Sequence, residues 1–208
     1  MGFYTRNPHF MKTVFKTLVV PHVDYCSQLW MPTRATQTLT IENLQRNFFN
    51  RIPAMKHLNY WEKLQHFKML SLQRRLERYR MLYVWKTLEG LVPNCGVTEG
   101  STRETRLGRK CKIPSINMGS TAAVKTIKEQ TFQVHGPQLF NTLPKYLRNM
   151  TKCTMDDFKE RLDLYLGQIP DEPSVPGLTP GACSPDGRPS NSLLHQRPAE
   201  RLQGGLGA

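Results

Sequence analysis

The chain has 208 residues and a formal net charge of +13, from 29 Lys and Arg against 16 Asp and Glu. Residues 1–150 supply 23 of the basic and 8 of the acidic side chains, whereas residues 151–208 supply 6 and 8. Hydrophobic residues make up 38%, so part of the chain is expected to lie outside any core. The uneven basic surplus favours a polyanionic partner, most often nucleic acid.

Several classes of protein are excluded by the same survey. No apolar run approaches the roughly 18–20 residues of a membrane span. The N-terminus lacks an apolar signal region, and Arg6 stands where a myristoylation pattern needs Ser or Thr. The cysteines are odd in number and form no CxxC pair, which predicts reduced thiols and no structural zinc. We therefore expect an intracellular protein, nuclear or cytoplasmic, that is neither secreted nor bound to a membrane.

Residues 9–30 predict a helix that a proline interrupts. The apolar positions form one stripe, with Phe10, Val14, Leu18, Tyr25 and Leu29. Pro21 lies inside this run, where a proline removes a backbone hydrogen bond. The sequence therefore predicts either a kink at Pro21 or two short helices, with Pro21 in the first turn of the second.

Further helices are predicted in the first half of the chain over residues 37–51, 60–68 and 72–89. The first of these carries its apolar residues at Ile41, Leu44, Phe48 and Ile52. Asn59 followed by Glu62 has the spacing of a capping box, which starts the second. Ser71 is expected to cap the third and Gly90 to end it.

The helix over 72–89 has two opposite faces. One face carries Leu72, Leu76, Tyr79 and Tyr83 and is predicted to face the core. The other carries Arg74, Arg78, Met81 and Trp85. We expect this second face to be either a solvated rim or a surface that contacts an anion.

The following residues, 93–133, predict a basic connection rich in loops. At most, short strands are expected around 112–116 and 124–132. Gly136 and Pro137 then open a short helical turn that stops before the next proline.

A last helix is predicted over residues 155–167, because Thr154 and Asp157 have the spacing of a second capping box. Beyond it, Pro170–Ala208 contains 7 Pro and 6 Gly among 39 residues and shows no apolar period. Such a segment buries too little apolar surface to offset the entropy of ordering, so it predicts a disordered tail.

Few residues suggest catalysis. Asp156-Asp157 resembles the paired aspartates of polymerase metal sites, but both lie in the first turn of a helix, where acids complement the dipole. His22 and Asp24 point apart on a helix, and Cys26 has no identifiable base. The chain has no phosphate-binding glycine loop. We predict no catalytic residue and no metal site.

The basic residues form the only group of side chains in the sequence that favours a particular function. Arginines that contact phosphates, beside an indole that packs on a sugar or base, are typical of nucleic-acid binding. The candidate residues are Arg74, Arg75, Arg78, Arg80 and Trp85 on the helix, with Arg103, Arg106, Arg109, Lys110 and Lys112 in the loop. The alternatives are a solvated helix face with Trp85 packed on another segment, and a loop that is a nuclear-import signal or simply solvated.

The segment FKTLVVPHVDYCSQLW, residues 15–30, resembles the LVxPHxxYCSxxW helix in polyproteins of non-LTR (LINE-type, jockey-like) retrotransposons. Further segments resemble these polyproteins in the same order: Ile41–Arg46, Arg51–Pro53, Leu70–Arg75 with Tyr83, Lys86 and Gly90, Gly136–Pro144, and Phe158–Asp163 with Ile169–Pro173. Together they cover about residues 10–175. In that family the first segment follows the palm of a reverse transcriptase.

The resemblance implies the thumb and post-palm part of an RNA-directed DNA polymerase from a mobile element. Such a fragment would lack the palm with its catalytic aspartates and the endonuclease. It would have no polymerase activity alone and no cofactor, because magnesium would belong to the palm. Any retained activity would be binding of RNA or an RNA–DNA hybrid.

We therefore predict a mainly α protein: a small, thumb-like helical bundle with a loop-rich segment, a C-terminal helix and a disordered tail. Its expected parts are residues 1–92, thumb-like; 93–133, basic connection; 134–169, C-terminal helical segment; and 170–208, tail. The alternative function is a helical module that binds an acidic protein, with Trp85 buried against the 10–30 helix, or a pseudogene product without function. The sequence predicts no oligomeric state.

Overall fold

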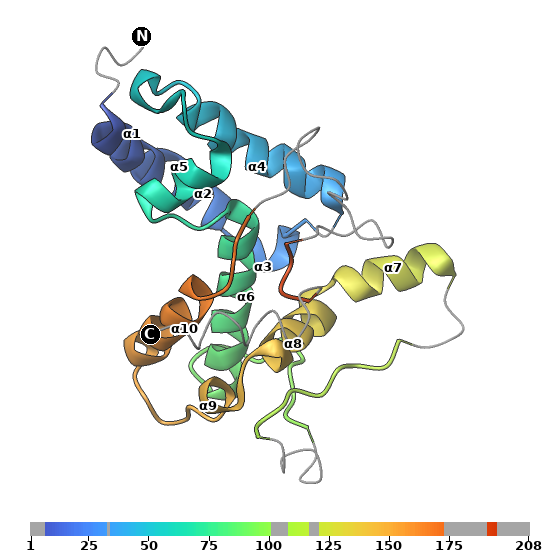
Figure 1. Cartoon of the computed structure of the whole chain (residues 1–208). Coiled ribbons are helices and arrows are strands. Elements are labelled where there is room, and N and C mark those ends of the chain that lie inside the picture. Colours follow the sequence, from blue (N-terminus) through green and yellow to red (C-terminus); the bar gives the residue numbers. More distant parts are fainter. Residues whose placement is uncertain (1–6, 33, 101–107, 117–120, 173–190, 195–208) are drawn as a thin grey trace. The chain divides into compact units, whose positions relative to one another are not determined.

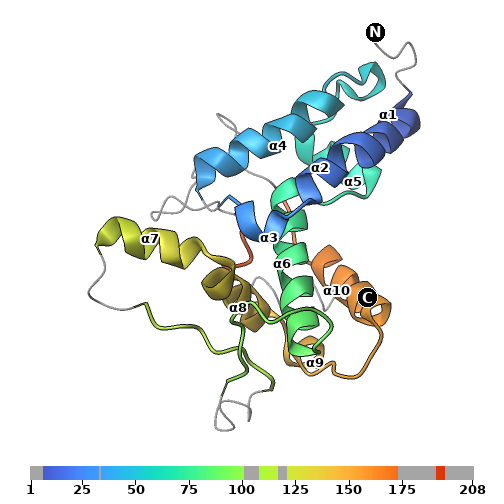
Figure 2. The same ribbon diagram turned by 180° about the vertical axis from the view of Figure 1, so that it is seen from behind.

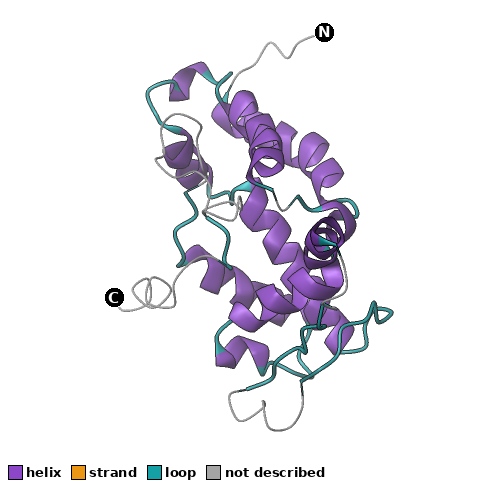
Figure 3. Cartoon of the chain, turned by 90° about the vertical axis from the view of Figure 1, so that its right-hand side faces the viewer, coloured by secondary structure: helices purple, strands orange, loops and turns teal. Residues whose placement is uncertain are grey.

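The computed structural model describes residues 7–32, 34–100, 108–116, 121–172 and 191–194. Every regular element in these ranges is a helix, apart from an isolated bridge between Glu99 and Cys111 (Figure 3). The described chain is therefore mainly α-helical, which confirms the predicted fold class. None of the described helices combines the length and the apolar character that crossing a membrane requires.

Two compact units make up the chain, and the division falls between Leu76 and Glu77, inside one helix. Unit 1 contains the described residues up to Leu76, together with Asp171, Glu172 and residues 191–194. Unit 2 contains the described residues from Glu77 to Pro170. Composition placed the predicted boundaries at residues 92, 133 and 169, so it gave no sign of a division inside the helix.

Unit 1 begins with a continuous helical run. Its parts are α1 (Pro8–Val14), the π-helical η1 (Phe15–Val19) and α2 (Val20–Asp24), followed by α3 (Ser27–Trp30) (Figure 1). Pro21 lies in the first turn of α2, as one of the two alternatives predicted. Proline cannot donate to the preceding turn, and the wider π turn directly before it accommodates this loss.

The remaining helices of unit 1 are α4 (Ala35–Phe49), the 3-10 turn η2 (Pro53–Met55), α5 (Tyr60–Phe67) and the first turns of α6 (Leu72–Leu88). Both views of the ribbon show α4 alongside the α1–α2 run (Figures 1 and 2). The predicted capping box is confirmed, because Glu62 N donates to Asn59 Oδ1 at 2.8 Å and Asn59 N donates to Glu62 Oε2 at 2.7 Å.

The buried face of the α1–α2 run differs from the predicted one. Met11, Phe15 and Val20 lie in the core of unit 1, and the Phe15 ring centroid is 5.3 Å from that of Phe49. The predicted stripe is instead largely exposed, including Leu18, Tyr25 and Leu29. The difference begins before the π turn, because in α1 Met11 is buried and Phe10 is exposed. The π turn carries one residue more than an α turn, so it rotates the later residues further from the regular pattern.

On α4, polar residues occupy much of the buried face. Thr38, Glu42 and Gln45 are buried, whereas Leu44 is exposed. Of the predicted apolar stripe, Ile41 and Phe48 pack against core residues and Ile52 is buried. The prediction is therefore wrong for Leu44 and incomplete for the polar residues.

Unit 2 contains the rest of α6 and four helices: α7 (Ala122–Gln130), α8 (Phe132–Thr142), α9 (Lys145–Arg148) and α10 (Met155–Gly167). The strand predicted around 124–132 is wrong, because α7 and the start of α8 cover it. The second capping box is confirmed, since Asp157 N donates to Thr154 Oγ1 at 3.1 Å.

Aromatic contacts hold unit 2 together. The Trp85 ring of α6 stacks on Phe158 of α10 with centroids 4.7 Å apart, and Tyr83 meets Phe132 of α8 edge-on at 5.2 Å. In two opposite views, α8 and α10 both lie beside this part of α6 (Figures 1 and 2). The contacts of Trp85 and Tyr83 thus join three helices of unit 2.

Part of the predicted tail lies in unit 1. Residues 173–190 and 195–208 are outside the described part of the chain. Asp171 and residues 191–193, however, are buried. The expectation of disorder does not hold for these residues, because a buried aspartate satisfies polar groups at the start of α6.

Candidate nucleic-acid interface

The arginines predicted to contact phosphate on α6 are buried. We call Arg74, Arg78 and Arg80 the α6 arginines; all three side chains are shielded from solvent, and Arg74 is 0% exposed. The expectation that they form a solvated or anion-binding face is therefore wrong. The physical reason is that carboxylates far away in the sequence neutralise two of them.

Arg74 belongs to a buried polar cluster in unit 1. Its Nε atom lies 3.7 Å from Asp171 Oδ1, and its Nη2 donates to the Asn191 carbonyl at 3.1 Å. Asp171 also accepts from Ser71 N at 2.8 Å and from Ser71 Oγ at 2.7 Å. Ser71 Oγ in turn accepts from Arg74 N at 3.1 Å, which confirms the predicted cap of α6.

The other two α6 arginines lie in unit 2. Arg78 forms a bidentate pair with Asp163 of α10, in which Nη2 donates to Oδ2 at 2.7 Å. Burial lowers the pKa of Arg80 to about 10, although the neighbouring charge of Glu77 acts in the opposite direction. Neither guanidinium is available to an external phosphate.

Trp85 is a core residue and does not face a ligand. It is 0% exposed. Its indole stacks on Phe158, and its Nε1 donates to the Met150 carbonyl at 2.9 Å. The prediction that Trp85 binds nucleic acid is thus wrong. The alternative, that Trp85 is buried against the 10–30 helix, is right about burial, but the helix that Trp85 stacks on is α10.

The basic loop is only partly described. Arg103 and Arg106 lie outside the described residues. Arg109 forms ion pairs with Glu89 and Glu99, and its Nη2 donates to the Leu88 carbonyl at 3.1 Å. These charge-assisted bonds raise the pKa of Arg109 against the opposing effect of burial, so its charge is used within unit 2.

Two lysines of the same loop are less enclosed. Lys110 is half-buried and Lys112 is exposed. Among the described residues of the predicted set, these two and Arg75 keep contact with solvent, and Arg109 keeps a little, since its side chain is 14% exposed.

A different group of cations lies together on unit 1. Lys12 and Lys16 are four residues apart on the α1–η1 run, and Arg75 of α6 lies close enough to Lys16 for its charge to act on that lysine. The pKa of Lys16 is lowered, first by partial burial and then by the positive charges of Lys12 and Arg75. We call Lys12, Lys16 and Arg75 the exposed basic cluster, because Lys16 is exposed and the other two are half-buried.

One carboxylate holds Arg75 in place. Arg75 Nε and Nη2 donate to the two oxygens of Asp24 at 2.8 and 2.7 Å. The side chains of both residues keep some access to solvent. The sequence contained a signal for this cluster, because Lys12 and Lys16 have the i, i+4 spacing of one helix face. The prediction for this helix used only its apolar positions and so did not include the two lysines.

Glu42 is the most perturbed acid of unit 1. Burial raises its pKa to about 7, against hydrogen bonds that favour its charged form. Tyr60 Oη donates to Glu42 Oε1 at 2.6 Å, and Gln73 N donates to Oε2 at 3.3 Å. Asp171 lies close enough to raise the pKa of Glu42 further. Because every partner is structural, this pair of acids stabilises the start of α6.

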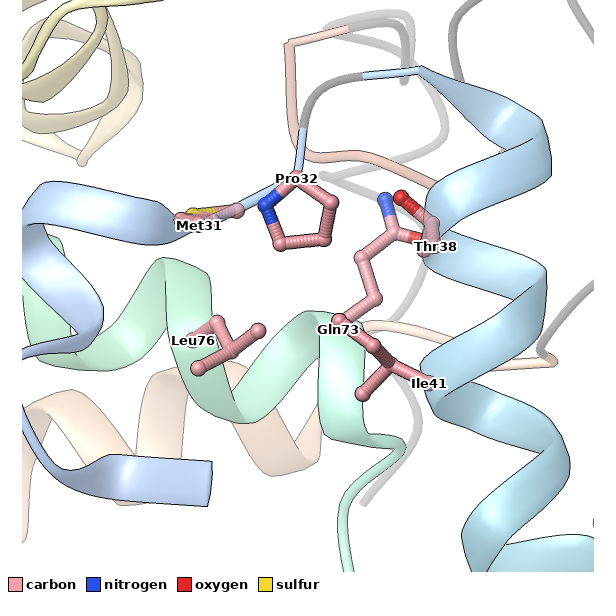
Figure 4. Close-up of a pocket in the computed structure, with 6 residues that line it drawn as sticks. All are labelled: Met31, Pro32, Thr38, Ile41, Gln73 and Leu76. Atoms are coloured by element: carbon pink, nitrogen blue, oxygen red, sulfur yellow. The ribbon is translucent and has the colours of Figure 1, made fainter. Parts of the chain in front are cut away.

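The surroundings of α4 and α6 offer little room for a small ligand. A pocket between Met31, Ile41, Gln73 and Leu76 has no volume that a water molecule could occupy (Figure 4). The picture shows Pro32 and Thr38 closing the same space. It is therefore a narrow packing gap inside unit 1 and not a binding site.

The paired aspartates take the role that the capping interpretation predicts. Asp157 Oδ2 accepts from Thr154 Oγ1 at 2.6 Å, and Asp156 is exposed in the same first turn. Within the described ranges, His, Cys, Asp and Glu side chains form no group of three that could hold a metal ion.

The fold and these contacts define a basic, mainly helical protein of two units. Comparison of the chain with protein-family models, curated proteins and solved structures gives no match.

Proposed function

We propose that the chain binds nucleic acid through the phosphate backbone, without reading sequence, and that the exposed basic cluster is the main contact. The observation that carries this proposal is the proximity of Lys12, Lys16 and Arg75, whose charges are close enough to affect the pKa of Lys16. Asp24 already pairs with Arg75, so the excess positive charge of this group comes from Lys12 and Lys16, and a phosphate would neutralise it. The net charge of +13 supports the same partner.

The ordered resemblance to retrotransposon polyproteins supports the class of nucleic acid. On that basis we propose that the chain is the thumb and post-palm part of a reverse transcriptase, and that it binds RNA or an RNA–DNA hybrid without catalysing polymerisation alone. A test of the second part is nucleotide incorporation by pure protein with Mg²⁺. Measurable incorporation would contradict it.

Binding can be tested by fluorescence anisotropy with a labelled RNA of about 20 nucleotides. The wild type is expected to bind at ~50 mM salt, and three phosphate contacts predict a slope of log K against log salt of about −2 on a single strand and about −3 on a duplex. The double variant Lys12→Glu/Lys16→Glu should reduce affinity at least tenfold and flatten the slope.

A matched control removes the same charge elsewhere. Lys159→Glu/Arg161→Glu alters two exposed cations of α10, in unit 2. If both double variants lose affinity equally, net charge alone causes binding and the cluster has no special role. If the wild type does not bind at ~50 mM salt, the proposed function is wrong.

A protein-interaction module is the second candidate, and α7 favours it. None of its nine residues is buried, and Val124 and Ile127 are exposed beside Lys125 and Lys128. A helix with an exposed apolar side and basic neighbours is typical of a segment that docks on an acidic partner. If Lys12→Glu/Lys16→Glu weakens nucleic-acid binding but leaves the affinity for an acidic protein partner unchanged, the two functions use different surfaces.

A further inference from the structure

Large aromatic and aliphatic side chains are exposed at the junction of α2 and α3. Tyr25 is 76% exposed, Leu29 83% and Trp30 40%. Cys26 separates the two helices, since α2 ends at Asp24 and α3 begins at Ser27. The backbone of Cys26 has a φ of 50°, in the left-handed region, which does not continue a helix. Because the chain turns here, the side chains that follow the turn do not continue the buried face of α2.

Trp30 is held in this exposed position by a hydrogen bond. Its Nε1 donates to the Tyr25 carbonyl at 2.7 Å, so the polar edge of the indole is already satisfied. The 40% of Trp30 that stays exposed is then open to contact with a partner. Indole and phenol rings that lie in water without closing a core are a typical basis for stacking on a planar partner.

Cations lie on both sides of this aromatic pair in the sequence. Lys16 precedes Tyr25 by nine residues, along η1 and α2, and Arg34 follows Trp30 and is exposed. His22, on the same helix, is also exposed. The nearest acid, Asp24, is paired with Arg75. This combination of planar rings and positive charge fits a strand that offers both bases and phosphates.

We propose that this surface binds single-stranded nucleic acid and that unpaired bases stack on Tyr25 and Trp30 while the exposed basic cluster and Arg34 contact the phosphates. The proposal rests on the proposed function and specifies its substrate as an unpaired strand. In a duplex the bases are stacked on one another, so their faces are closed to these rings. An acidic protein would satisfy the cations but would not require exposed ring faces.

The test compares a labelled dT15 strand with a duplex of the same length. Tyr25→Ala should weaken binding of dT15 about tenfold, the range measured when a stacking ring is removed, and weaken duplex binding less than twofold. Tyr25→Phe keeps the ring and should bind dT15 like the wild type. Because Tyr25 is exposed and its contact with Trp30 uses the backbone carbonyl, thermal unfolding of both variants should match the wild type.

Each other outcome has a distinct meaning. If Tyr25→Ala leaves dT15 binding unchanged while Lys12→Glu/Lys16→Glu weakens it, stacking is overturned and the proposed function stands. If Tyr25→Ala weakens strand and duplex equally, or weakens binding of polyglutamate as much as that of dT15, the ring contacts something other than unpaired bases and the inference is wrong. If the wild type binds neither nucleic acid, both proposals fail.

Discussion

The α6 arginines and the exposed basic cluster carry the same charge in opposite surroundings. Arg74 and Arg78 pair with Asp171 and Asp163 and are shielded from solvent. Lys16 is exposed, and the neighbouring charges that lower its pKa are those of the cations Lys12 and Arg75. The comparison shows that a high local density of arginine can indicate an internal ion-pair network, whereas two lysines in an apolar-looking helix can carry the available positive surface.

The largest effect is expected where a buried arginine loses its carboxylate. Asp171→Ala removes the acceptor for Ser71 and the counter-charge of Arg74. Breaking a buried pair in this way should lower the free energy of unfolding by about 3–5 kcal/mol. The measurement is urea denaturation monitored by circular dichroism.

Glu172→Ala is the matched control, because Glu172 is the exposed neighbour of Asp171. It should change the free energy of unfolding by less than about 0.5 kcal/mol. A loss below about 1 kcal/mol for Asp171→Ala would show that the buried cluster does not stabilise α6, and the contrast between the two basic regions would then be weak.

The pH dependence of stability tests the buried acids beside α6. Burial raises the pKa of Glu42 from 4.5 to about 7 in the folded chain. Between these values the folded chain keeps a proton that the unfolded chain releases, so the free energy of unfolding should fall as pH rises. The fall from this group is about 3 kcal/mol and is complete above the folded pKa.

Glu42→Gln removes this titration. Stability measured at pH 4, 5.5, 7 and 8 should show the variant gaining on the wild type as pH rises, whereas Glu160→Gln, at an exposed position of α10, should follow the wild type. Parallel pH profiles for Glu42→Gln and the wild type would mean that folding does not raise the pKa of Glu42.

A smaller effect is expected at the exposed basic cluster. Asp24→Asn removes the ion pair of Arg75, which is open to solvent, and should cost about 0.5–1 kcal/mol of stability. The same change leaves one positive charge uncompensated, so nucleic-acid affinity should rise. The slope against log salt should steepen by up to about 0.7 on a single strand.

Asp156→Asn is the charge-matched comparison, since Asp156 is exposed on α10. It should raise affinity less and leave the slope unchanged. Equal effects of the two variants would place Arg75 outside the contact surface.

The sequence predicted where helices begin more reliably than which side they bury. Asn59 and Thr154 were identified as caps because a capping box is local: the side chains involved are three residues apart. The helix α7 was missed because Val124, Thr126 and Ile127 favour strands, although Val124 and Ile127 have helical spacing.

The faces of α6 could not be predicted because the partners of its arginines are distant. Asp163 lies 85 residues from Arg78, and Asp171 lies 100 residues from Ser71. No local pattern contains such a pairing. For the same reason, the sequence identified Arg75 as a candidate but not the proximity of Lys12 and Lys16 to it.

The hydrogen bonds between Ser71 and Asp171 also affect when the start of α6 can be stabilised during synthesis on the ribosome. The polypeptide between Leu76 and Asp171 must be translated first, which takes roughly 5–20 s at typical rates of elongation. During that interval the nascent N-terminal segment lacks the carboxylate that accepts from Ser71. Termination before residue 171 would thus leave the polar groups at the start of α6 without this acceptor.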